Sequence, residues 1–198
     1  MKRMLDLCSG LGGASEAFVA AGWEVLRIDN NPLMSGVPHT KIMDIFSFEE
    51  WVEDNLANLP KPNLIWFSPP CRDFSTAYGS PRSIAQREGK EWNPSLEILQ
   101  CGLRIIEMLE PKYWIVENVR GAIKFFEDDL GVPNQIHQAY VLWGKFPGFQ
   151  PGHFASKAEK DSRHSPIRSN LKAKIPIELS QSLFEAIEYQ KSLFDYVA

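Results

Sequence analysis

Cysteine is scarce in this chain of 198 residues, which has only Cys8, Cys71 and Cys101. An odd number of widely spaced cysteines excludes a disulfide framework, and the sequence has no Cys-x-x-Cys pair to suggest a zinc site. Each thiol is therefore interpreted by itself. We expect Cys8 and Cys101 to be small buried apolar residues, which leaves Cys71 as the candidate for chemistry.

Long apolar runs are also absent. No stretch reaches the roughly 20 apolar residues of a membrane-spanning helix. Two basic residues near the N-terminus are followed by Asp6, not by the apolar run of a signal peptide. We therefore expect a cytoplasmic protein with no membrane partner. The sequence has no internal repeat and is 44% hydrophobic, which predicts a single domain over residues 1–198.

A strong positive charge is missing as well. The formal net charge is −4, which argues mildly against a dedicated nucleic-acid coat protein. The charge is uneven, however, because residues 155–175 contain six lysines and arginines but only two acids. This basic segment includes Arg163 and Arg168. It is interpreted either as a solvated surface loop or as a contact with nucleic acid.

Apolar runs alternate with helical patterns, which is typical of parallel βαβ units. Strands are expected at residues 3–7, 24–28, 41–45, 63–67, 113–116 and 139–143. Helices are expected at residues 14–21, 46–59 and 94–109, with one or two closing helices within 175–196, and loops at 72–92 and 144–174. The pattern predicts an α/β fold with a doubly wound, mostly parallel sheet. Ligands of such sheets bind beyond the carboxyl ends of the strands.

A glycine-rich turn follows the first expected strand and reads Ser9-Gly10-Leu11-Gly12-Gly13. Glycines let the backbone approach a ligand closely, and the next helix offers free N–H groups. By itself, such a turn can hold a dinucleotide, a phosphate or nothing.

Three acids at strand ends narrow the choice of ligand. Asp6, Asp29 and Asp44 together favour an adenosine ligand without phosphates, since a pyrophosphate would be repelled. Asp29 lies where an acid typically binds ribose hydroxyls. The alternative is that Asp6 and Asp29 only cap helices.

Two further motifs follow the fourth and fifth strands. Ser68-Pro69-Pro70-Cys71 places a cysteine on a turn stiffened by two prolines, and Arg72 would favour its thiolate, the nucleophilic form. Glu117-Asn118-Val119 ends an apolar strand. Partial burial there would raise the pKa of Glu117 until it can donate a proton near neutrality. Asn118 is expected to hold the loop through side-chain hydrogen bonds.

The order, strand placement and spacing of these motifs resemble those of the DNA cytosine-5 methyltransferase family. The resemblance is carried by residues 6–18, by Pro70-Cys71 with Phe74-Ser75, and by Glu117-Asn118-Val119. It covers about residues 3–144 and implies a Rossmann-like fold, S-adenosylmethionine as cofactor and DNA as substrate. It also implies that Cys71 attacks C6 of cytosine while Glu117 contacts N3 and the exocyclic amine, so that C5 can accept a methyl group.

The resemblance implies a set of site residues and no metal. The catalytic residues would be Cys71, Glu117, Asn118 and Ser75. The cofactor residues would be Asp6, Ser9, Gly10, Leu11, Gly12, Gly13, Asp29, Asn30, Asp44, Ile45 and Pro70. The residues that contact DNA would be Arg72, Arg82, Arg87, Lys90, His137, Arg163 and Arg168. Residues 72–92 would be a mobile loop that closes over a flipped cytosine.

The sequence departs from the family pattern in three places. His137 and Ala139 stand where arginines that reach the target base and phosphate are expected. The large target-recognition domain is missing, and a short basic loop at residues 145–174 takes its place. We therefore expect little sequence specificity, or a protein partner or second copy that supplies recognition. An expected Gly-Asn run before the closing helix is absent. Such compact members resemble those of phages and mobile elements.

Three alternatives stay open. Ser68-Pro69-Pro70 also fits an amino-methyltransferase acting on adenine N6 or cytosine N4, although Cys71 stands where that motif has an aromatic residue. An RNA cytosine-5 methyltransferase shares the same core chemistry. The third alternative is a degenerate regulatory subunit that binds S-adenosylmethionine and needs a partner methyltransferase. The intact Cys71 and Glu117 argue against that last alternative.

Overall fold

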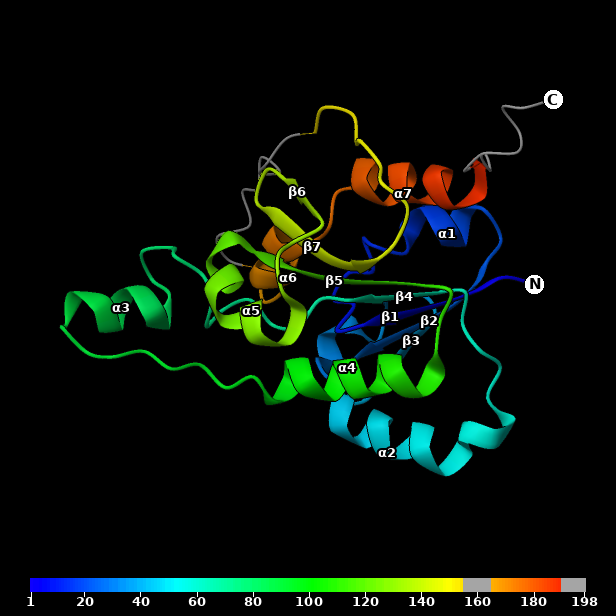
Figure 1. Ribbon diagram of the computed structural model, residues 1–198, viewed down its shortest axis with the longest axis horizontal. Coiled ribbons are helices and arrows are strands. Elements are labelled where there is room, and N and C mark those ends of the chain that lie inside the picture. The colour runs from blue at the N-terminus through cyan, green and yellow to red at the C-terminus, as the bar shows by residue number, and fades with distance from the viewer. Residues whose placement is uncertain (155–164, 190–198) are drawn as a thin grey trace.

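The computed structural model describes residues 1–154 and 165–189 (Figure 1). Within them, one sheet contains the strands β1 (Arg3–Leu7), β2 (Glu24–Asp29), β3 (Thr40–Ile42), β4 (Leu64–Phe67), β5 (Tyr113–Val119), β6 (Gln135–His137) and β7 (Tyr140–Lys145). The strand order is β3-β2-β1-β4-β5-β7-β6. Strand β7 runs antiparallel to both of its neighbours, and the other pairings are parallel. The predicted α/β fold with a mostly parallel sheet is confirmed.

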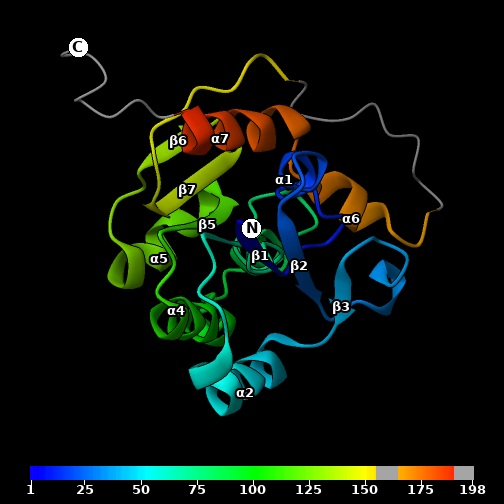
Figure 2. The same ribbon diagram turned by 90° about the vertical axis from the view of Figure 1, so that its right-hand side faces the viewer.

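Helices cover both faces of the sheet (Figure 2). They are α1 (Glu16–Ala20), α2 (Ile45–Asn55), α3 (Pro81–Arg87), α4 (Glu97–Leu109), α5 (Ile123–Leu130), α6 (Arg168–Ala173) and α7 (Ile177–Tyr189), with short 3-10 turns η1 (Pro32–Met34), η2 (Leu56–Asn58) and η3 (Arg120–Ala122). Helices α1 and α7 pack together on one face, and α2 and α4 pack on the other. None of the helices described is long and apolar enough to cross a membrane.

The core is built around β4, whose four residues are all buried. Ile65 and Phe67 point into the cluster beneath α2 and α4, whereas Leu64 and Trp66 point into the cluster beneath α1 and α7. A strand covered on both faces needs a continuous apolar run, which is what the sequence has here. Full burial of each such side chain stabilises the fold by roughly 1.5–3 kcal/mol.

Some elements differ from the sequence prediction. Strand β6 was not predicted, since three residues are too few to show a period, and α3 and α6 lie inside segments predicted to be loops. The third strand ends at Ile42 instead of residue 45. The reason is that the Asp44 carboxylate accepts hydrogen bonds from the N–H groups of Phe46 and Ser47 and so begins α2.

The carboxyl ends of β1, β4 and β5 lie at one edge of the sheet, because these strands are parallel and adjacent. The strand order reverses between β1 and β4, and ligands of open α/β sheets bind at such a switch point. The turn between β6 and β7 reaches the same edge, since Tyr140 pairs with Val119 at the end of β5. Helix α3 projects beyond this edge (Figure 1).

Candidate active site and cofactor cleft

A cleft of about 570 Å³ lies at this edge of the sheet. Its walls are the glycine-rich turn, the cysteine turn after β4, the end of β5 and helix α6. The lining includes the predicted residues Asp6, Ser9, Gly10, Asp29, Asn30, Asp44, Ile45, Pro70, Cys71 and Glu117. Leu11, Gly12 and Gly13 belong to the same turn but do not line the cleft. The fold thus brings the cysteine motif, the glutamate motif and most of the predicted cofactor residues into one cavity.

A buried hydrogen-bond network of Arg27, Ser15 and Asp6 supports the glycine-rich turn. Gly10 and Gly12 have φ angles of +52° and +71°, which glycine adopts without strain. The Arg27 side chain donates hydrogen bonds to Ser15 Oγ at 2.8 Å and to the Gly12 carbonyl at 3.1 Å. Ser15 in turn donates to Asp6 at 2.5 Å. A side chain at position 12 would collide with the Arg27 guanidinium. Sequence reasoning missed this network, whose only signal was an arginine within an apolar strand.

Two oxygens of the cleft have no hydrogen-bond partner among the described residues. They are Asp6 Oδ1 and Ser9 Oγ, and both are buried. Burial also raises the pKa of Asp6 to about 7, although the Ser15 hydroxyl and Arg27 lower it in part. Unpaired buried acceptors are costly, so a ligand with a cationic amino group would stabilise this end of the cleft. The residues present therefore fit the amino-acid end of S-adenosylmethionine.

Asp29 and Asp44 line the cleft while also supporting the backbone. Asp29 accepts hydrogen bonds from the N–H groups of Gly10 at 2.7 Å and Asn31 at 2.9 Å. Asp44 caps α2 and accepts a hydrogen bond from the Ser47 hydroxyl at 2.7 Å. This bond, together with backbone N–H donors, lowers the pKa of Asp44. Each carboxylate oxygen has a further lone pair, so both residues can support the backbone and contact a ligand.

The cysteine turn is a short hydrogen-bonded structure after β4. The N–H groups of Phe74 and Ser75 donate to the Cys71 carbonyl at 3.2 and 3.0 Å. Phe74 is buried with its ring 4.9 Å from that of Phe126 on α5. Ser75 does not line the cleft. Its hydroxyl accepts a hydrogen bond from Ala77 N–H at 3.1 Å, so Ser75 shapes the loop that leads to α3.

The Cys71 thiol is half-buried, and burial followed by the nearby Glu117 carboxyl raises its pKa. The prediction that Arg72 favours the thiolate is wrong for this structure. Arg72 is exposed to solvent and does not contribute to the shift. The protein by itself therefore favours the thiol form of Cys71. The thiol must lose its proton before the sulfur can act as a nucleophile.

Glu117 is 8% exposed at the end of β5, and burial raises its pKa to about 7. The predicted direction of this shift is confirmed. The Ser68 hydroxyl donates to Glu117 Oε2 at 2.9 Å and partly offsets the shift, and Ser68 itself accepts from the Trp66 indole at 2.8 Å. From the sequence, Ser68 was interpreted only as part of the Pro-Pro turn, and this hydrogen bond was not predicted. The signal was its position directly after β4, which lies next to β5. A carboxyl with a pKa near 7 can hold or release a proton under neutral conditions.

Asn118 is 1% exposed and does not line the cleft. Its side chain donates a hydrogen bond to the Pro69 carbonyl at 2.9 Å and accepts one from Val119 N–H at 2.9 Å. The predicted role of Asn118 in holding the loop is confirmed by these two bonds.

Tyr140 lines the same cleft and was not predicted as a site residue. It lies on β7 opposite Val119. Burial, with smaller contributions from Glu117 and Cys71, raises the pKa of Tyr140 to about 12. Its hydroxyl is therefore neutral and faces the two groups predicted to perform the chemistry. Tyr140 begins a strand that runs antiparallel to β5 and starts beside its end, an arrangement for which the sequence carried no signal.

Two of the arginines predicted to meet DNA lie on the loop that carries α3. Arg82 is half-buried and donates to the carbonyls of Phe74 at 3.2 Å and Gly121 at 3.0 Å, so it braces this loop. Arg87 is exposed, and its guanidinium lies 4.0 Å from the ring centre of Tyr78. Tyr78 is itself 81% exposed. Arg87 and Tyr78 thus form an exposed stacked pair beyond the edge of the sheet.

The remaining residues predicted to meet DNA are dispersed. Lys90 is exposed and forms an ion pair with Glu88 at 2.7 Å. Arg168 is exposed at the start of α6, whose later residues line the cleft. His137 is buried on β6, outside this cleft. Arg163 lies outside the described residues. The described part of the chain contains no cluster of histidines, cysteines and acids that could hold a metal ion.

Known proteins are similar to the part of the chain that carries most of this site. The family model for C-5 cytosine-specific DNA methylases matches residues 2–134. The chain is 29% identical over 122 residues to the Type II methyltransferase M.FnuDI of Fusobacterium nucleatum, covering 61% of this chain but only 33% of that protein. It is 30% identical over 125 residues to the Type II methyltransferase M.HgiGI of Herpetosiphon aurantiacus, covering 61% of this chain and 92% of that protein.

Among solved structures, similarity extends to a candidate DNA modification methyltransferase encoded by an E. coli prophage. The two share 18% sequence identity with a TM-score of 0.48, over 73% of this chain and 47% of that chain.

Proposed function

Because this chain belongs to the C-5 cytosine-specific DNA methylase family, we propose that it transfers a methyl group from S-adenosylmethionine to C5 of cytosine in DNA. The observation that carries this proposal is that Cys71 and the buried Glu117 line one cleft together with the glycine-rich turn. The covalent route through Cys71 is inferred from the chemistry of these two side chains.

The Cys71 thiol first loses its proton to solvent, and its sulfur then attacks C6 of cytosine and forms an S–C6 bond. The electron pair of the C5–C6 double bond shifts to form a C4–C5 double bond, the C4–N3 double bond opens, and N3 takes the proton of Glu117. C5 thereby becomes nucleophilic enough to take a methyl group, which an unactivated cytosine is not. S-adenosylmethionine supplies that methyl group as an electrophile. As C5 takes the methyl group, the C4–N3 double bond is restored and the N3 proton returns to the Glu117 carboxylate. Loss of the C5 proton to a water molecule then restores the C5–C6 double bond and expels Cys71 as a thiolate.

The electrostatics of Cys71 and Glu117 suit this order of reaction steps. Burial raises both pKa values, and the Glu117 charge further raises that of Cys71, so the cleft disfavours a thiolate beside a carboxylate. Glu117 is neutral while Cys71 is a thiolate, and it becomes an anion only after Cys71 is bonded to carbon. The pair therefore never carries more than one negative charge, so no step places two anions in the buried cleft.

The cofactor is proposed to lie across the carboxyl ends of β1, β2 and β3. Asp6 and Ser9 would accept hydrogen bonds from its amino group, because their unpaired oxygens line that end. Asp29 would hold the ribose hydroxyls, and Asp44 with Ile45 would meet the adenine. Three acids in one cleft suit a ligand with a cationic end and no phosphates.

A second candidate function is a subunit that binds S-adenosylmethionine and needs a partner methyltransferase. The observation in its favour is that no cation of the described residues lowers the pKa of Cys71, while Ala139 lines the cleft where the family pattern has an arginine. A protein partner or a second copy would then complete the site and supply target recognition.

Incubation with labelled S-adenosylmethionine tests the proposal. Mixed-sequence double-stranded DNA, single-stranded DNA and RNA would be supplied in parallel, and nucleosides would be analysed by mass spectrometry. We expect 5-methylcytosine from DNA with the wild-type protein and with Cys101→Ala, whose thiol lies outside the cleft, and none with Cys71→Ala. If calorimetry shows S-adenosylmethionine binding but no substrate is methylated, the partner-dependent function replaces the enzymatic one. Product from RNA alone would change the substrate class.

A further inference from the structure

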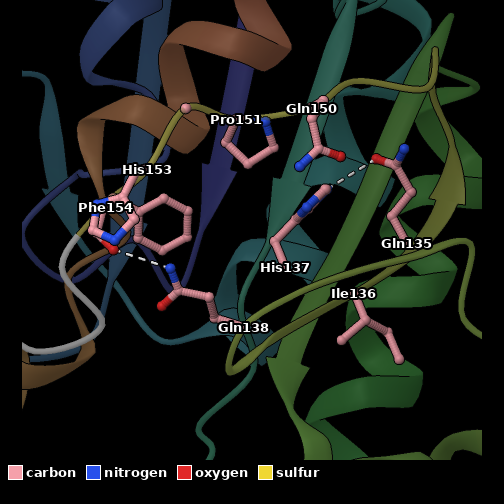
Figure 3. A pocket seen from close by; sticks show the side chains of 9 residues that line it. Gln135, Ile136, His137, Gln138, Gln150, Pro151, His153 and Phe154 are labelled. Atoms are coloured by element: carbon pink, nitrogen blue, oxygen red, sulfur yellow. Dashed lines mark hydrogen bonds between the residues drawn. The ribbon is translucent and has the colours of Figure 1, made fainter.

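A second pocket of about 510 Å³ lies beside the cleft (Figure 3). One wall is β6 with the following residue Gln138, and the other wall is formed by residues 150–154, after β7. Figure 3 shows Gln135, His137 and Gln150 grouped on one side of it and Gln138, His153 and Phe154 on the other. The proposed reaction uses none of these side chains.

The pocket adjoins the position proposed for the target base. His137 on β6 pairs with Tyr140 on β7, and Tyr140 pairs with Val119 at the end of β5. Gln138 lines the second pocket, whereas the next two residues, Ala139 and Tyr140, line the cleft. The ring of Phe154 lies 6.0 Å from that of Tyr140. A ligand in the second pocket would therefore be separated from the cleft by the Tyr140 and Phe154 rings.

Two glutamine amides are available for a ligand. Gln138 donates one hydrogen bond from Nε2 to the Phe154 carbonyl at 3.0 Å, which leaves its Oε1 as an acceptor and a second N–H as a donor. The backbone at Gln138 has a φ of +56°, an uncommon conformation for a residue other than glycine. Gln150 is exposed and forms no hydrogen bond with another described residue. Each amide can therefore offer a donor and an acceptor side by side.

His137 contributes an uncharged imidazole ring to the lining of the pocket. The Gln135 amide donates from Nε2 to the Phe149 carbonyl at 3.2 Å, so its Oε1 faces His137 Nε2, also at 3.2 Å. This arrangement places the imidazole proton on Nε2 and leaves Nδ1 as an acceptor. Burial lowers the pKa of His137, which keeps the ring neutral. The Phe149 ring packs against it at 5.1 Å.

The pocket wall suits a nucleobase better than a phosphate. Among the described residues that line it there is no lysine, arginine, aspartate or glutamate. Phosphates are bound mainly by cations and N–H groups. Bases, in contrast, are recognised by paired donors and acceptors on their edges and by aromatic faces. Glutamine matches the N6 and N7 groups of adenine in this way.

We propose that this pocket binds the nucleobase adjoining the target cytosine, with the Gln138 and Gln150 amides contacting it from opposite sides of the pocket. Adenine is the base whose edge a glutamine amide fits best. The inference rests on the proposed action on DNA and extends it, because it gives the domain that carries Cys71 and Glu117 a means of selecting its target.

A library of oligonucleotides tests the proposal. Each carries one cytosine with two random nucleotides on either side, and sequencing after bisulfite treatment reports which members are methylated. We expect wild-type protein to favour adenine by about fivefold or more at one flanking position, as a good amide pair implies. Gln150→Ala should reduce that preference below about twofold. Gln100→Ala on α4 is the matched control and should keep the preference. Equal preferences in wild type and Gln150→Ala would overturn the assignment.

A binding experiment separates this inference from the proposed function. Fluorescence anisotropy would compare intact oligonucleotides with ones that lack a single flanking base. Wild-type protein should lose affinity at one position, and Gln150→Ala should not. If this difference appears although no cytosine is methylated, the pocket stands and the methyltransferase proposal fails. If cytosine is methylated and removing the base weakens both proteins equally, the pocket assignment fails alone.

Discussion

The side-chain amide of Asn118 donates a hydrogen bond of 2.9 Å to the carbonyl oxygen of Pro69. Asn118 follows Glu117 on β5, and Pro69 belongs to the turn that presents Cys71. The bond therefore joins the two strand ends that carry the proposed acid and nucleophile. Because Asn118 is 1% exposed, water does not compete for this bond, and the spacing of the two reactive groups depends on it.

Replacing Asn118 with alanine should affect both stability and catalysis. The variant leaves the Pro69 carbonyl and the Val119 N–H without their partner, which costs about 1–3 kcal/mol in a buried site. We expect the free energy of unfolding to fall by about that amount in urea denaturation. We also expect kcat to fall more than about tenfold, with the affinity for S-adenosylmethionine unchanged. Asn55→Ala removes a half-buried bond to Trp51, remote from the cleft, and should lower stability without lowering kcat. An equal loss of kcat in both variants would mean that stability alone explains the effect.

The buried Glu117 should give stability a marked pH dependence. Its pKa is about 7 in the folded protein against an ordinary value of 4.5. Between these values the unfolded chain loses the proton while the folded protein keeps it, so stability is greatest below the lower value and falls as pH rises toward 7. The loss from this group is on the order of 3 kcal/mol.

Glu117→Gln should remove the contribution of Glu117 to the pH dependence of the free energy of unfolding, measured by denaturation between pH 4.5 and 8. Some slope should remain, since Asp6 also has a pKa raised to about 7. Glu185→Gln on the exposed side of α7 should leave the wild-type slope unchanged. A slope identical in wild type and Glu117→Gln would show that Glu117 is not protonated in the folded state.

The two glycines of the cofactor turn should respond differently to alanine. At Gly12, a methyl group would collide with the buried Arg27 side chain, and φ is +71°. We expect Gly12→Ala to lose at least about 2 kcal/mol of stability from strain and displacement of the guanidinium, and to lose most of its affinity for S-adenosylmethionine. At Gly10, the nearest atom would be the Asn170 amide at 3.7 Å. Gly10→Ala should therefore cost only about 1–2 kcal/mol. Thermal unfolding and calorimetry would compare them, and equal losses would contradict the role given to Arg27.

Asp29→Asn tests whether this carboxylate contacts the cofactor. Asp29 accepts hydrogen bonds from Gly10 and Asn31 through its two oxygens, and asparagine keeps only one acceptor of the two. If Asp29 also holds the ribose, affinity for S-adenosylmethionine and for adenosine should fall together, by about tenfold or more. Calorimetry with each ligand measures this. A variant that loses stability but binds both ligands as wild type does would show that Asp29 only supports the turn.

Much of the active-site region was accessible from the sequence because it depends on local patterns. Short apolar runs predicted the central strands, and polar or glycine-rich residues directly after them predicted the ligand-binding edge. Parallel strands end at the same edge of a sheet. The resemblance of their motifs also implied that Cys71 and Glu117 act on the same base, although they are far apart in the chain. The raised pKa of Glu117 also followed from its place at the end of an apolar strand.

The tertiary structure decided which atoms are paired, buried or free. The Arg27 side chain beneath the glycine turn, the Ser68 hydroxyl on Glu117 and the Tyr140 ring in the cleft all come from strand pairings that no local pattern reports. The expectation for Arg72 failed for the same reason, since adjacency in sequence did not place its charge beside the thiol. The second pocket exists because residues 150–154 fold back along β6. The sequence alone thus determined the central strands and the edge of the sheet that carries the site. The exact strand ends, the burial and the hydrogen-bond partners required the packed chain, because they depend on contacts between residues distant in sequence.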